Sequence, residues 1–413
     1  MTAPNGAIKF NNLTGSDTQS SGLGPAVAVY GSGASTTGAS NVVTGINTAG
    51  VSSGDLLWVQ SSSGRQFSII TTVDSGSQVT CDDNFDNTES GRTWAIGGKR
   101  ATLDNSDSRR VLADDVPAST TGVPFWSVEI QETGTPYYCT STLDIGTGGG
   151  SAIKLYGDTG NVEISFNSNT TGISGRKNFK LQNLKLSNTN ATKTASYAVY
   201  RTLNSVSMIL ENVVLDQTNN WYRGVSGNIA SGDLQAINCD ISHCVDYGIR
   251  TNAAQKLLNC RVQNNGGSGV LERTRGHYIS CIFSGNSGYG VQWDGNPGYG
   301  SAFANCIVKD NTSGGLYVRS TYSGMNTSIV GCIFDSNGGY AIDLSSADSE
   351  FHHSIVENNA FYNSTTSNYR TYDRGGITLT ADPFVDAANG DFNLNNAAGG
   401  GAVLRSTSYT LGG

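Results

Sequence analysis

Leu258-Asn-Cys-Arg-Val262 returns as Ile279-Ser-Cys-Ile-Phe283 and again as Ala304-Asn-Cys-Ile-Val308. Two more copies carry the same cysteine, Ile237-Asn-Cys-Asp-Ile241 and Val330-Gly-Cys-Ile-Phe334, and degenerate copies flank the set. The positions equivalent to the cysteine are 184, 213, 239, 260, 281, 306, 332 and 360, with separations of 29, 26, 21, 21, 25, 26 and 28 residues. A repeat of this length, built from short β-branched runs between Gly and Asn, indicates a solenoid.

Each repeat holds two or three short runs of alternating apolar and polar residues, and no stretch has a sustained helical period. Alternation places one side of a strand in the interior and the other in solvent. Gly and Asn between the runs supply the positive φ that sharp corners need. Three short strands per coil, stacked on similar coils about 4.8 Å apart, make a right-handed parallel β-helix. The sequence therefore predicts an all-β fold with this solenoid over residues 150–379.

The repeated cysteines are predicted to form an interior ladder, because equivalent residues of stacked coils lie above one another. The asparagines beside them are predicted to form a partial ladder at a corner. A zinc site needs close pairs of ligands, and side chains that stack in parallel would strain a disulfide. We therefore expect free structural thiols rather than a disulfide or metal set. The ladder residues are Cys239, Cys260, Cys281, Cys306, Cys332, Asn238, Asn259 and Asn305.

The composition excludes several functional classes. The 413 residues include 53 Gly, only 14% are charged, and the formal net charge is −8. The chain offers no basic face for phosphate, so we expect no nucleic acid partner. It has no apolar run of about 18 residues, so we expect no membrane span. It has no phosphate loop and no metal-binding pattern, so we expect no cofactor and no metal.

The chain divides into four predicted parts. Residues 1–35 are polar and Gly-rich, and predict an extended arm. Residues 36–149 carry β-rich runs such as Asp55-Leu-Leu-Trp-Val-Gln60, and are either a small β domain or irregular first coils. The solenoid follows over 150–379, and residues 380–413 are expected to form a C-terminal cap and tail. The start, Met1-Thr-Ala-Pro-Asn-Gly-Ala-Ile-Lys9, lacks a secretory signal, so we expect synthesis in a host cytoplasm.

The closing phrase Asp382-Pro-Phe-Val-Asp386, followed by Gly390-Asp-Phe-Asn-Leu394, resembles the last turns of many right-handed parallel β-helix proteins. Together with the repeat, this resemblance covers residues 150–395. The usual phrase continues with a Ser-Pro-Ala segment, which residues 395–405 replace, so the last cap is expected to differ. The opening phrase Phe10-Asn-Asn-Leu-Thr-Gly-Ser-Asp-Thr18 and the module around residues 54–96 resemble leaders of β-helix proteins from bacteriophages.

This second resemblance implies a protein of the virion surface, with other virion proteins as partners. It is also the only reason to expect a homo-oligomer, namely a trimer. The leading hypothesis is a bacteriophage structural protein on the virion exterior: a capsid decoration protein, a fibre or a tailspike-like adhesin that contacts a host polysaccharide. The alternative is a polysaccharide-degrading lyase or glycoside hydrolase of the depolymerase type. A bacterial surface adhesin would need an export signal that the sequence does not show.

A second phrase follows several repeats, as in Tyr247-Gly-Ile249 and Tyr289-Gly-Val291. The outward positions after it mix Arg, Asp and aromatic residues. Aromatic rings can stack on sugar faces, and charged groups can bond sugar hydroxyls or carboxylates. A plain solvated sheet face is the alternative at any single position. The glycan-binding candidates are Arg250, Arg273, Gln292, Trp293, Tyr317 and Arg319.

Asp294 and Asp343 are the catalytic candidates. One coil lies between the coils that hold these two residues, so their carboxylates are expected about 9.6 Å apart along the axis. This is near the distance between the two catalytic carboxyl groups of inverting glycosidases. Arg319 in the intervening coil would keep both carboxylates ionised, whereas a general acid needs a raised pKa. We therefore favour binding over catalysis.

Overall fold

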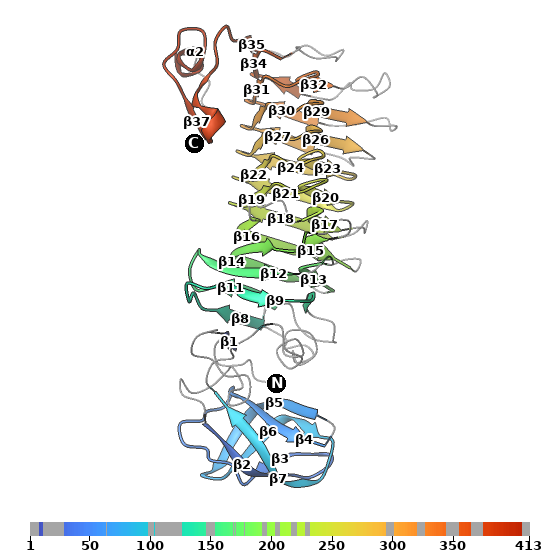
Figure 1. The fold of residues 1–413 in the computed structure, drawn as a ribbon, viewed down its shortest axis with the longest axis vertical. Helices are drawn as coiled ribbons and strands as arrows, with labels where there is room; N and C mark the ends of the chain where they lie inside the picture. The colour runs from blue at the N-terminus through green and yellow to red at the C-terminus, as the bar shows by residue number, and fades with distance from the viewer. Residues whose placement is uncertain are drawn as a thin grey trace. The chain divides into compact units, whose positions relative to one another are not determined.

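The structure is a computed structural model of the chain, and its two compact units, residues 1–189 and 190–413, are described separately (Figure 1). The residues that it describes are 8–10, 29–62, 64–97, 103, 126–145, 153–167, 169, 171–176, 178–191, 196–202, 207–215, 221–227, 232–294, 301–319, 327–343, 355–364 and 375–406. Most of the predicted arm 1–35 therefore lies outside the described residues.

The predicted β-rich N-terminal module is confirmed, and it is a closed antiparallel barrel. Strand alternation fills its interior with apolar side chains that include Val43, Leu57, Ile70 and Trp94. The barrel closes because the strand Glu89–Ile96 pairs both with Val29–Thr36 and with Leu56–Ser61, so no strand edge is left open. The domain boundaries at 35, 149 and 379 stay predictions. The strand order is β2 (Val29–Thr36), β3 (Ser40–Thr44), β6 (Gln78–Phe85), β5 (Gly64–Ser75), β4 (Leu56–Ser61) and β7 (Glu89–Ile96).

The other described strands of the first unit are mostly short and pair in parallel. Val128 pairs with Leu155, and Leu155 in turn pairs with Leu181, so a buried position repeats above itself from coil to coil. These strands are β1 (Ile8–Phe10), β8 (Trp126–Ile130), β9 (Tyr137–Cys139), β10 (Leu143–Ile145), β11 (Ile153–Gly157), β12 (Val162–Phe166), β13 (Ile173–Gly175) and β14 (Phe179–Asn188).

The second unit is a parallel solenoid, which confirms the predicted fold class. Its strands fall into two groups, which we call the cysteine sheet and the tyrosine sheet after the residues that distinguish them. The tyrosine sheet comprises β15 (Tyr197–Arg201), β17 (Arg223–Gly227), β20 (Ile249–Thr251), β23 (Val270–Glu272), β26 (Tyr289–Asp294), β29 (Gly314–Arg319) and β32 (Ile342–Asp343).

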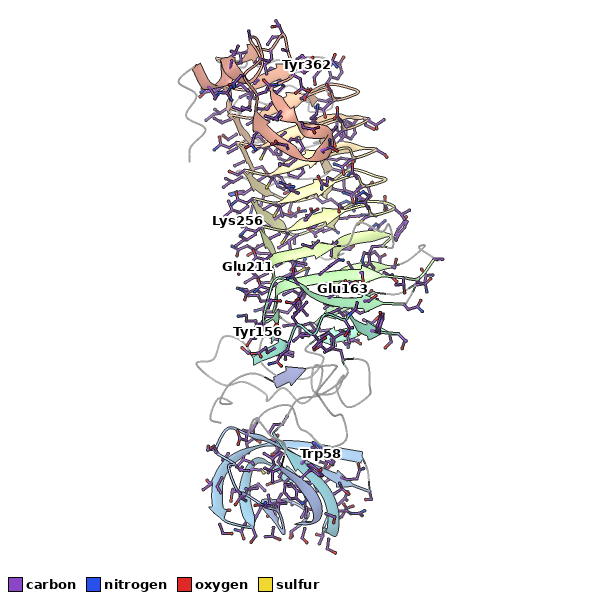
Figure 2. All side chains as sticks on the ribbon, turned by 60° about the vertical axis from the view of Figure 1, so that its left-hand side comes forward. Trp58, Tyr156, Glu163, Glu211, Lys256 and Tyr362 are labelled. Carbon is purple, nitrogen blue, oxygen red and sulfur yellow. The ribbon has the colours of Figure 1, made fainter. Side chains whose placement is uncertain are left out.

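The cysteine sheet bends once in each coil, at the residue that precedes the cysteine. Figure 2 shows Glu211 and Lys256 projecting from this side of the stack. Its strands are β16 (Met208–Leu215), β18 (Asp233–Ile237), β19 (Asp240–Ser242), β21 (Ala254–Leu258), β22 (Arg261–Gln263), β24 (Gly276–Ile279), β25 (Ile282–Ser284), β27 (Ser301–Ala304), β28 (Ile307–Lys309), β30 (Thr327–Val330), β31 (Ile333–Asp335), β33 (Ile355–Glu357), β34 (Ala360–Tyr362) and β35 (Ile377–Thr378).

The bend explains the repeated Asn–Cys pair. Asn238, Asn259 and Asn305 have φ values of 52°, 52° and 53°, a left-handed conformation that Asn tolerates better than most residues. The side-chain amide of Asn238 donates to the Oδ1 of Asn212 in the preceding coil at 3.2 Å. The turn then directs the next side chain, the cysteine, into the interior.

The eight cysteines are all free thiols, and all are buried. In the repeat, the backbone N–H of Cys306 points at the Sγ of Cys332 from a distance of 3.5 Å, so thiols of neighbouring coils lie one above the other. Burial raises the pKa of the Cys281 and Cys306 thiols. Because the thiolate is the reactive form, these side chains act as small apolar residues at neutral pH.

A second ladder, which the sequence did not reveal, lies at the corner that precedes the tyrosine sheet. Asn265 donates from Nδ2 to the Oδ1 of Asn286 at 2.9 Å, Asn286 donates to Asn311 at 2.9 Å, and Asn311 donates to Asn337 at 3.0 Å. Each Oδ1 also accepts the backbone N–H of the residue below, as Asn286 does from Asn265 at 3.1 Å. These amides are buried, and we call them the buried asparagine ladder.

Close packing at this corner also explains the glycine of the second phrase. A Cβ added to Gly269 would lie 2.6 Å from the carbonyl oxygen of Gly290, and one added to Gly290 would lie 2.8 Å from a methyl carbon of Val308. Since neither a backbone oxygen nor a packed core residue can move aside cheaply, only glycine fits here. The glycines let the ladder corner and the tyrosine sheet pack against each other.

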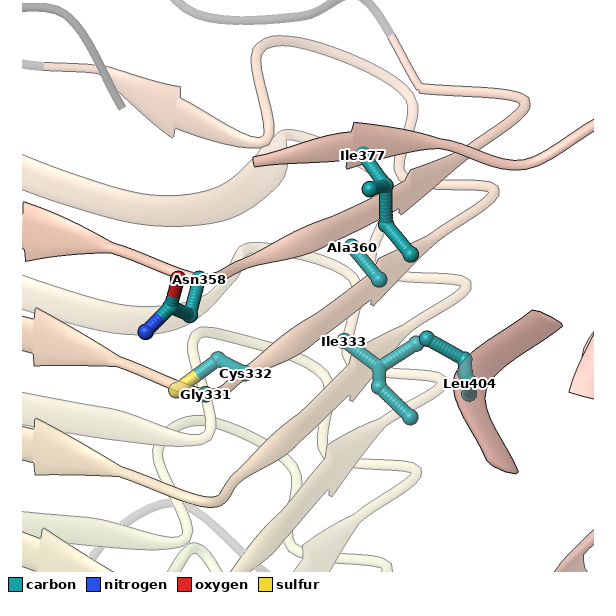
Figure 3. A pocket seen from close by; sticks show the side chains of 7 residues that line it. All are labelled: Gly331, Cys332, Ile333, Asn358, Ala360, Ile377 and Leu404. Atoms are coloured by element: carbon teal, nitrogen blue, oxygen red, sulfur yellow. The ribbon is translucent and has the colours of Figure 1, made fainter. Parts of the chain in front are cut away.

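The C-terminal segment folds against the outer side of the cysteine sheet (Figure 1). It contains β36 (Phe384–Asp386), a 3₁₀ turn (Ala387–Asn389), β37 (Asp391–Leu394) and α2 (Gly401–Ser406). Phe384 and Leu404 bury apolar surface against Ile333 and Ala360. Leu404 also closes a small apolar pocket beside Cys332, and Figure 3 shows its lining. The segment thereby shields the apolar outer residues of the last coils from water.

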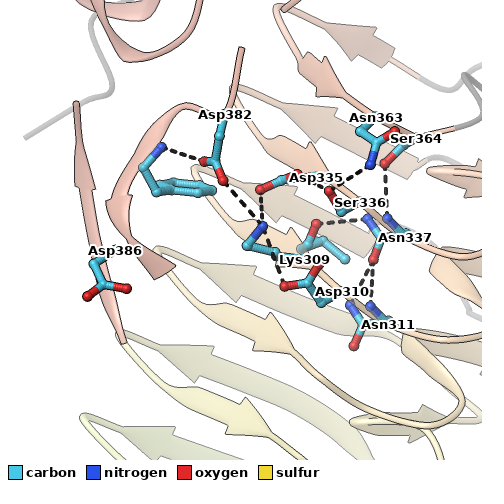
Figure 4. A network of polar contacts seen from close by, with 12 residues as sticks. Lys309, Asp310, Asn311, Asp335, Ser336, Asn337, Asn363, Ser364, Asp382 and Asp386 are labelled. Carbon is cyan, nitrogen blue, oxygen red and sulfur yellow. Dashed lines mark hydrogen bonds and ion pairs between the residues drawn. The ribbon is translucent and has the colours of Figure 1, made fainter. Parts of the chain in front are cut away.

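A buried ion pair supports the same junction. The Nζ of Lys309 lies 2.5 Å from Asp335, 3.4 Å from Asp310 and 3.9 Å from Asp382, which begins the closing phrase (Figure 4). Burial raises the pKa of the Asp335 carboxyl, and the hydrogen bond from Lys309 offsets part of that rise. Lys309 therefore neutralises a carboxylate whose residue is 0% exposed.

Replacing Lys309 with Met is expected to lower the free energy of unfolding by about 3 kcal/mol at neutral pH, because it leaves a buried carboxylate unpaired. Urea unfolding of the purified variant would measure the change. Lys256→Met is the matched control, since that lysine is exposed on the same sheet. A loss no larger in K309M than in K256M would contradict a stabilising role for the pair.

Candidate functional site

The outer face of the tyrosine sheet brings together aromatic and charged side chains from successive coils. In one column of the sheet, Tyr197 pairs with Arg223 of the next coil. In a second column, Arg250 pairs with Leu271, and Leu271 pairs in turn with Gln292. The next two coils continue this second column with Tyr317 and Asp343. The face is therefore built by the repeat itself, since each coil contributes one residue to each column.

One end of this face is an arginine–tyrosine cluster. The guanidinium carbon of Arg223 lies 5.1 Å from the ring centroid of Tyr222 and 5.9 Å from that of Tyr247, while its Nε pairs with Asp246 at 2.7 Å. The guanidinium of Arg250 lies 5.6 Å from the same Tyr247 ring. Stacked cations hold these rings in place at a half-exposed surface. The cluster consists of Tyr197, Tyr222, Arg223, Asp246, Tyr247 and Arg250.

The other end is a stacked pair of tyrosines. The rings of Tyr289 and Tyr317 lie 4.7 Å apart with an interplanar angle of 14°. Gly314, whose φ is 152°, lies opposite Tyr289 in the next coil, and a Cβ there would come within 3.1 Å of the Tyr289 ring. The glycine thus leaves room for the stack. Burial raises the pKa of the Tyr289 hydroxyl, and the charge of Asp343 adds to the rise.

The structure corrects one glycan-binding prediction, that of Trp293. Its side chain is 1% exposed and stacks on Tyr278 inside the solenoid, with centroids 6.4 Å apart. The physical reason is strand alternation: Gln292 points outward in β26, so its neighbour Trp293 points inward. A buried indole cannot contact a polysaccharide. Leu271, which pairs with Arg250 in register, is likewise buried, at 3% exposure.

The other candidates occupy the face as follows. Arg250, Gln292 and Tyr317 are half-buried, and Arg273 is exposed one coil beyond Arg250. The backbone of Arg319 pairs with Asp294 in register, but its side chain lies outside the described residues. Their role in binding a glycan stays a prediction.

Asp294 and Asp343 both lie on this face, and both are half-buried. Register places them in different columns, since Asp294 pairs with Arg319 and Asp343 pairs with Tyr317. Their catalytic role stays a prediction. Within the described parts of the chain, no group of three or more His, Cys, Asp and Glu residues is placed to hold a metal ion.

Sequence reasoning missed the part of the cluster that β17 supplies. Tyr222 and Arg223 precede Gly224-Val225, which is the equivalent of Gly248-Ile249 in the next coil. Aligning that degenerate copy of the second phrase would have placed both residues on the face. The second phrase is thus present in this coil, but Arg223 stands at the position that Tyr247 occupies in the next coil.

A buried carboxyl lies beneath the same sheet. Glu272 is 1% exposed, and the hydroxyl of Tyr278 donates to its Oε2 at 2.5 Å. The same hydroxyl lies 3.4 Å from the Oε1 of Gln255, whose amide donates to Thr251 at 2.9 Å. Burial raises the pKa of the Glu272 carboxyl to about 8. This acid is therefore expected to be protonated inside the folded protein at neutral pH, when it can itself donate to Tyr278.

Comparison with known proteins confirms the fold. Residues 275–361 match the family model described as the right handed beta helix region. No curated protein sequence matches the chain significantly. Within the part of the chain that the structure describes, no helix is long and apolar enough to cross a membrane.

Solved structures that resemble this chain include a mannuronan C-5 epimerase A-module (AlgE4) of Azotobacter vinelandii, with 12% identity, a TM-score of 0.41 and coverage of 68% of this chain and 96% of that one. The Dettilon tailspike protein has 10% identity, a TM-score of 0.37 and coverage of 62% and 60%. An alpha-1,3-glucanase catalytic domain has 11% identity, a TM-score of 0.24 and coverage of 86% and 88%. At these identities the likeness concerns the β-helix alone.

Proposed function

We propose that this protein binds a polysaccharide through the outer face of the tyrosine sheet, and that it does so as a structural protein of a virion exterior. The single observation that carries the binding proposal is the stacked pair of Tyr289 and Tyr317 beside the arginine–tyrosine cluster. Rigid aromatic rings provide large contact area at low entropic cost, and half-buried tyrosines keep a polar hydroxyl at the surface. Both properties suit a sugar chain, which has apolar ring faces and polar edges.

The virion role rests on the sequence. The opening phrase around Phe10 and the module of residues 54–96 resemble leaders of bacteriophage β-helix proteins, and the barrel would be the part that docks to other virion proteins. Assembly as a trimer follows from the same resemblance. A capsid decoration protein, a fibre and a tailspike-like adhesin all fit this description, and immunogold labelling of the source virions would distinguish head from tail.

The double variant Tyr289→Ala/Tyr317→Ala is expected to weaken binding to the cognate host polysaccharide at least tenfold, because it removes both stacking rings. Titration calorimetry against purified host surface polysaccharides would measure the affinity. Tyr138→Ala is a suitable control, because that tyrosine is 68% exposed and lies in β9, which is not a strand of this sheet. Unchanged affinity in the double variant would remove this face from the proposal.

The same experiment addresses the enzyme alternative. Release of reducing ends from the bound polysaccharide, lost in Asp294→Asn or Asp343→Asn, would favour a depolymerase. Binding without any release would leave the protein as an adhesin.

A further inference from the structure

We infer that the polysaccharide is acidic, and that its carboxylates bind at Arg250 and Arg273 while an uncharged sugar face stacks at Tyr289 and Tyr317. This inference rests on the proposed function, since it names the chemical class of the ligand of that face. It is argued from the distribution of charge along the successive coils.

The positive charges of the face are not equally neutralised. Arg223 is paired with Asp246 at 2.7 Å. Arg250 contacts the ring of Tyr247, and none of the described carboxylates forms an ion pair with it or with Arg273. Arg273 is also exposed. Neither guanidinium group is therefore held in an ion pair with a described carboxylate, although the charges of Asp246 and Asp294 also act on Tyr247 beside Arg250.

These two arginines are placed to act on one chain. Thr251 pairs with Glu272, and Arg273 directly follows Glu272 in the bend after β23, so Arg250 and Arg273 belong to neighbouring coils and are offset by two residues. Strand geometry then separates their Cα atoms by roughly 8 Å, a distance that two long side chains can close. A guanidinium binds a carboxylate with two parallel hydrogen bonds, and the ring of Tyr247 orients the group at Arg250 before any ligand arrives.

At the opposite end of the face, the charged group that acts on the stacked tyrosines is a carboxylate. The charge of Asp343 contributes to the raised pKa of Tyr289, so a carboxylate lies close to the stacked pair. An anionic sugar would be repelled there, whereas an uncharged ring would stack. Arg250 and Gln292 occupy the same column two coils apart, or about 9.6 Å, which is of the order of the length of a disaccharide. The face thus fits a polymer that alternates acidic and neutral sugars along the solenoid axis.

The test uses pairs of probes: purified bacterial surface polysaccharides, each in its native form and in a form whose carboxyl groups have been reduced to alcohols. For the cognate polymer, we expect at least tenfold tighter binding of the native form than of the reduced form. Arg250→Gln should remove most of that difference between the native and the reduced form. Arg261→Gln, an exposed arginine of the cysteine sheet, is the matched control.

The outcomes separate this inference from the proposed function. Equal binding of native and reduced forms, or binding of neutral polymers only, overturns the acidic ligand but leaves the glycan-binding face intact. Failure of the whole panel to bind overturns both. A native preference that Arg250→Gln leaves unchanged while Arg261→Gln abolishes it would place the acid-binding site on the other sheet, and would also overturn the inference.

Discussion

Glu272→Gln is expected to abolish a loss of stability that the wild-type protein undergoes as the pH rises from about 5 to about 8. The ordinary pKa of this carboxyl is 4.5, and burial raises it to about 8 in the folded protein. Between these values the unfolded chain releases the proton and the folded chain keeps it. The folded state therefore loses stability with rising pH, by about 1.4 kcal/mol for each pH unit.

Across the full interval the loss is on the order of 5 kcal/mol, which is a large part of the stability of an ordinary domain. The destabilisation is absent below pH 4.5 and complete above pH 8, which is the sign expected for an acid whose folded pKa is raised. Glutamine preserves the shape and an acceptor for the hydroxyl of Tyr278, but it does not ionise.

Urea unfolding at half-unit steps between pH 5 and pH 8.5 would measure the effect for both proteins. The free energies should be similar near pH 5 and diverge as the pH rises, with the variant the more stable. Subtraction of the two curves cancels the contributions of other carboxyls, such as Asp335. Parallel curves for the two proteins would show that Glu272 is already ionised in the folded state.

Asn286→Leu is expected to lower the free energy of unfolding by about 4 kcal/mol. The side chain of Asn286 accepts from the N–H and the Nδ2 of Asn265, and it donates to Asn311 and to the carbonyl of Val262. Leucine of similar size leaves four buried polar groups without these partners, and each such loss costs about 1–3 kcal/mol before the structure relaxes.

Chemical denaturation followed by circular dichroism would quantify this loss, with Ser287→Ala in the same coil as the control because Ser287 is exposed. The double variant Asn286→Leu/Asn311→Leu should cost less than the two single variants together, since their mutual hydrogen bond is lost only once. Strict additivity would mean that the amides stabilise their coils independently and do not act as a ladder.

The sequence was sufficient to predict the solenoid, because a one-dimensional repeat places equivalent residues in equivalent environments. The Asn–Cys pair illustrates this: Asn259 has the left-handed φ that a corner needs, and Cys260 follows into the interior. The β-rich character of the N-terminal module was also predictable from strand runs. Its closure into a barrel depends on long-range pairing of β2 and β4 with β7, which no local pattern encodes.

The candidate face was predictable only in part, and the errors have a common cause. Trp293 was assigned to the surface as a neighbour of Gln292, although adjacent strand residues must point to opposite sides. The buried asparagine ladder was missed because its members have small or polar neighbours, as in Gly285-Asn-Ser287, and such a sequence is also typical of an exposed turn. Burial of polar residues such as Glu272 is decided by packing between coils, and a single sequence does not record that packing.

The backbone hydrogen bonds between coils of the second unit join parallel strands, so they lie along the direction in which the coils stack. A tensile force applied along that direction loads each coil-to-coil interface in series, and the weakest interface yields first. Release of a 21-residue coil, the shortest in the repeat, would add roughly 70 Å of extended chain. Under load, such a molecule would lengthen in discrete steps and absorb mechanical work, while the coils that remain stacked keep their register.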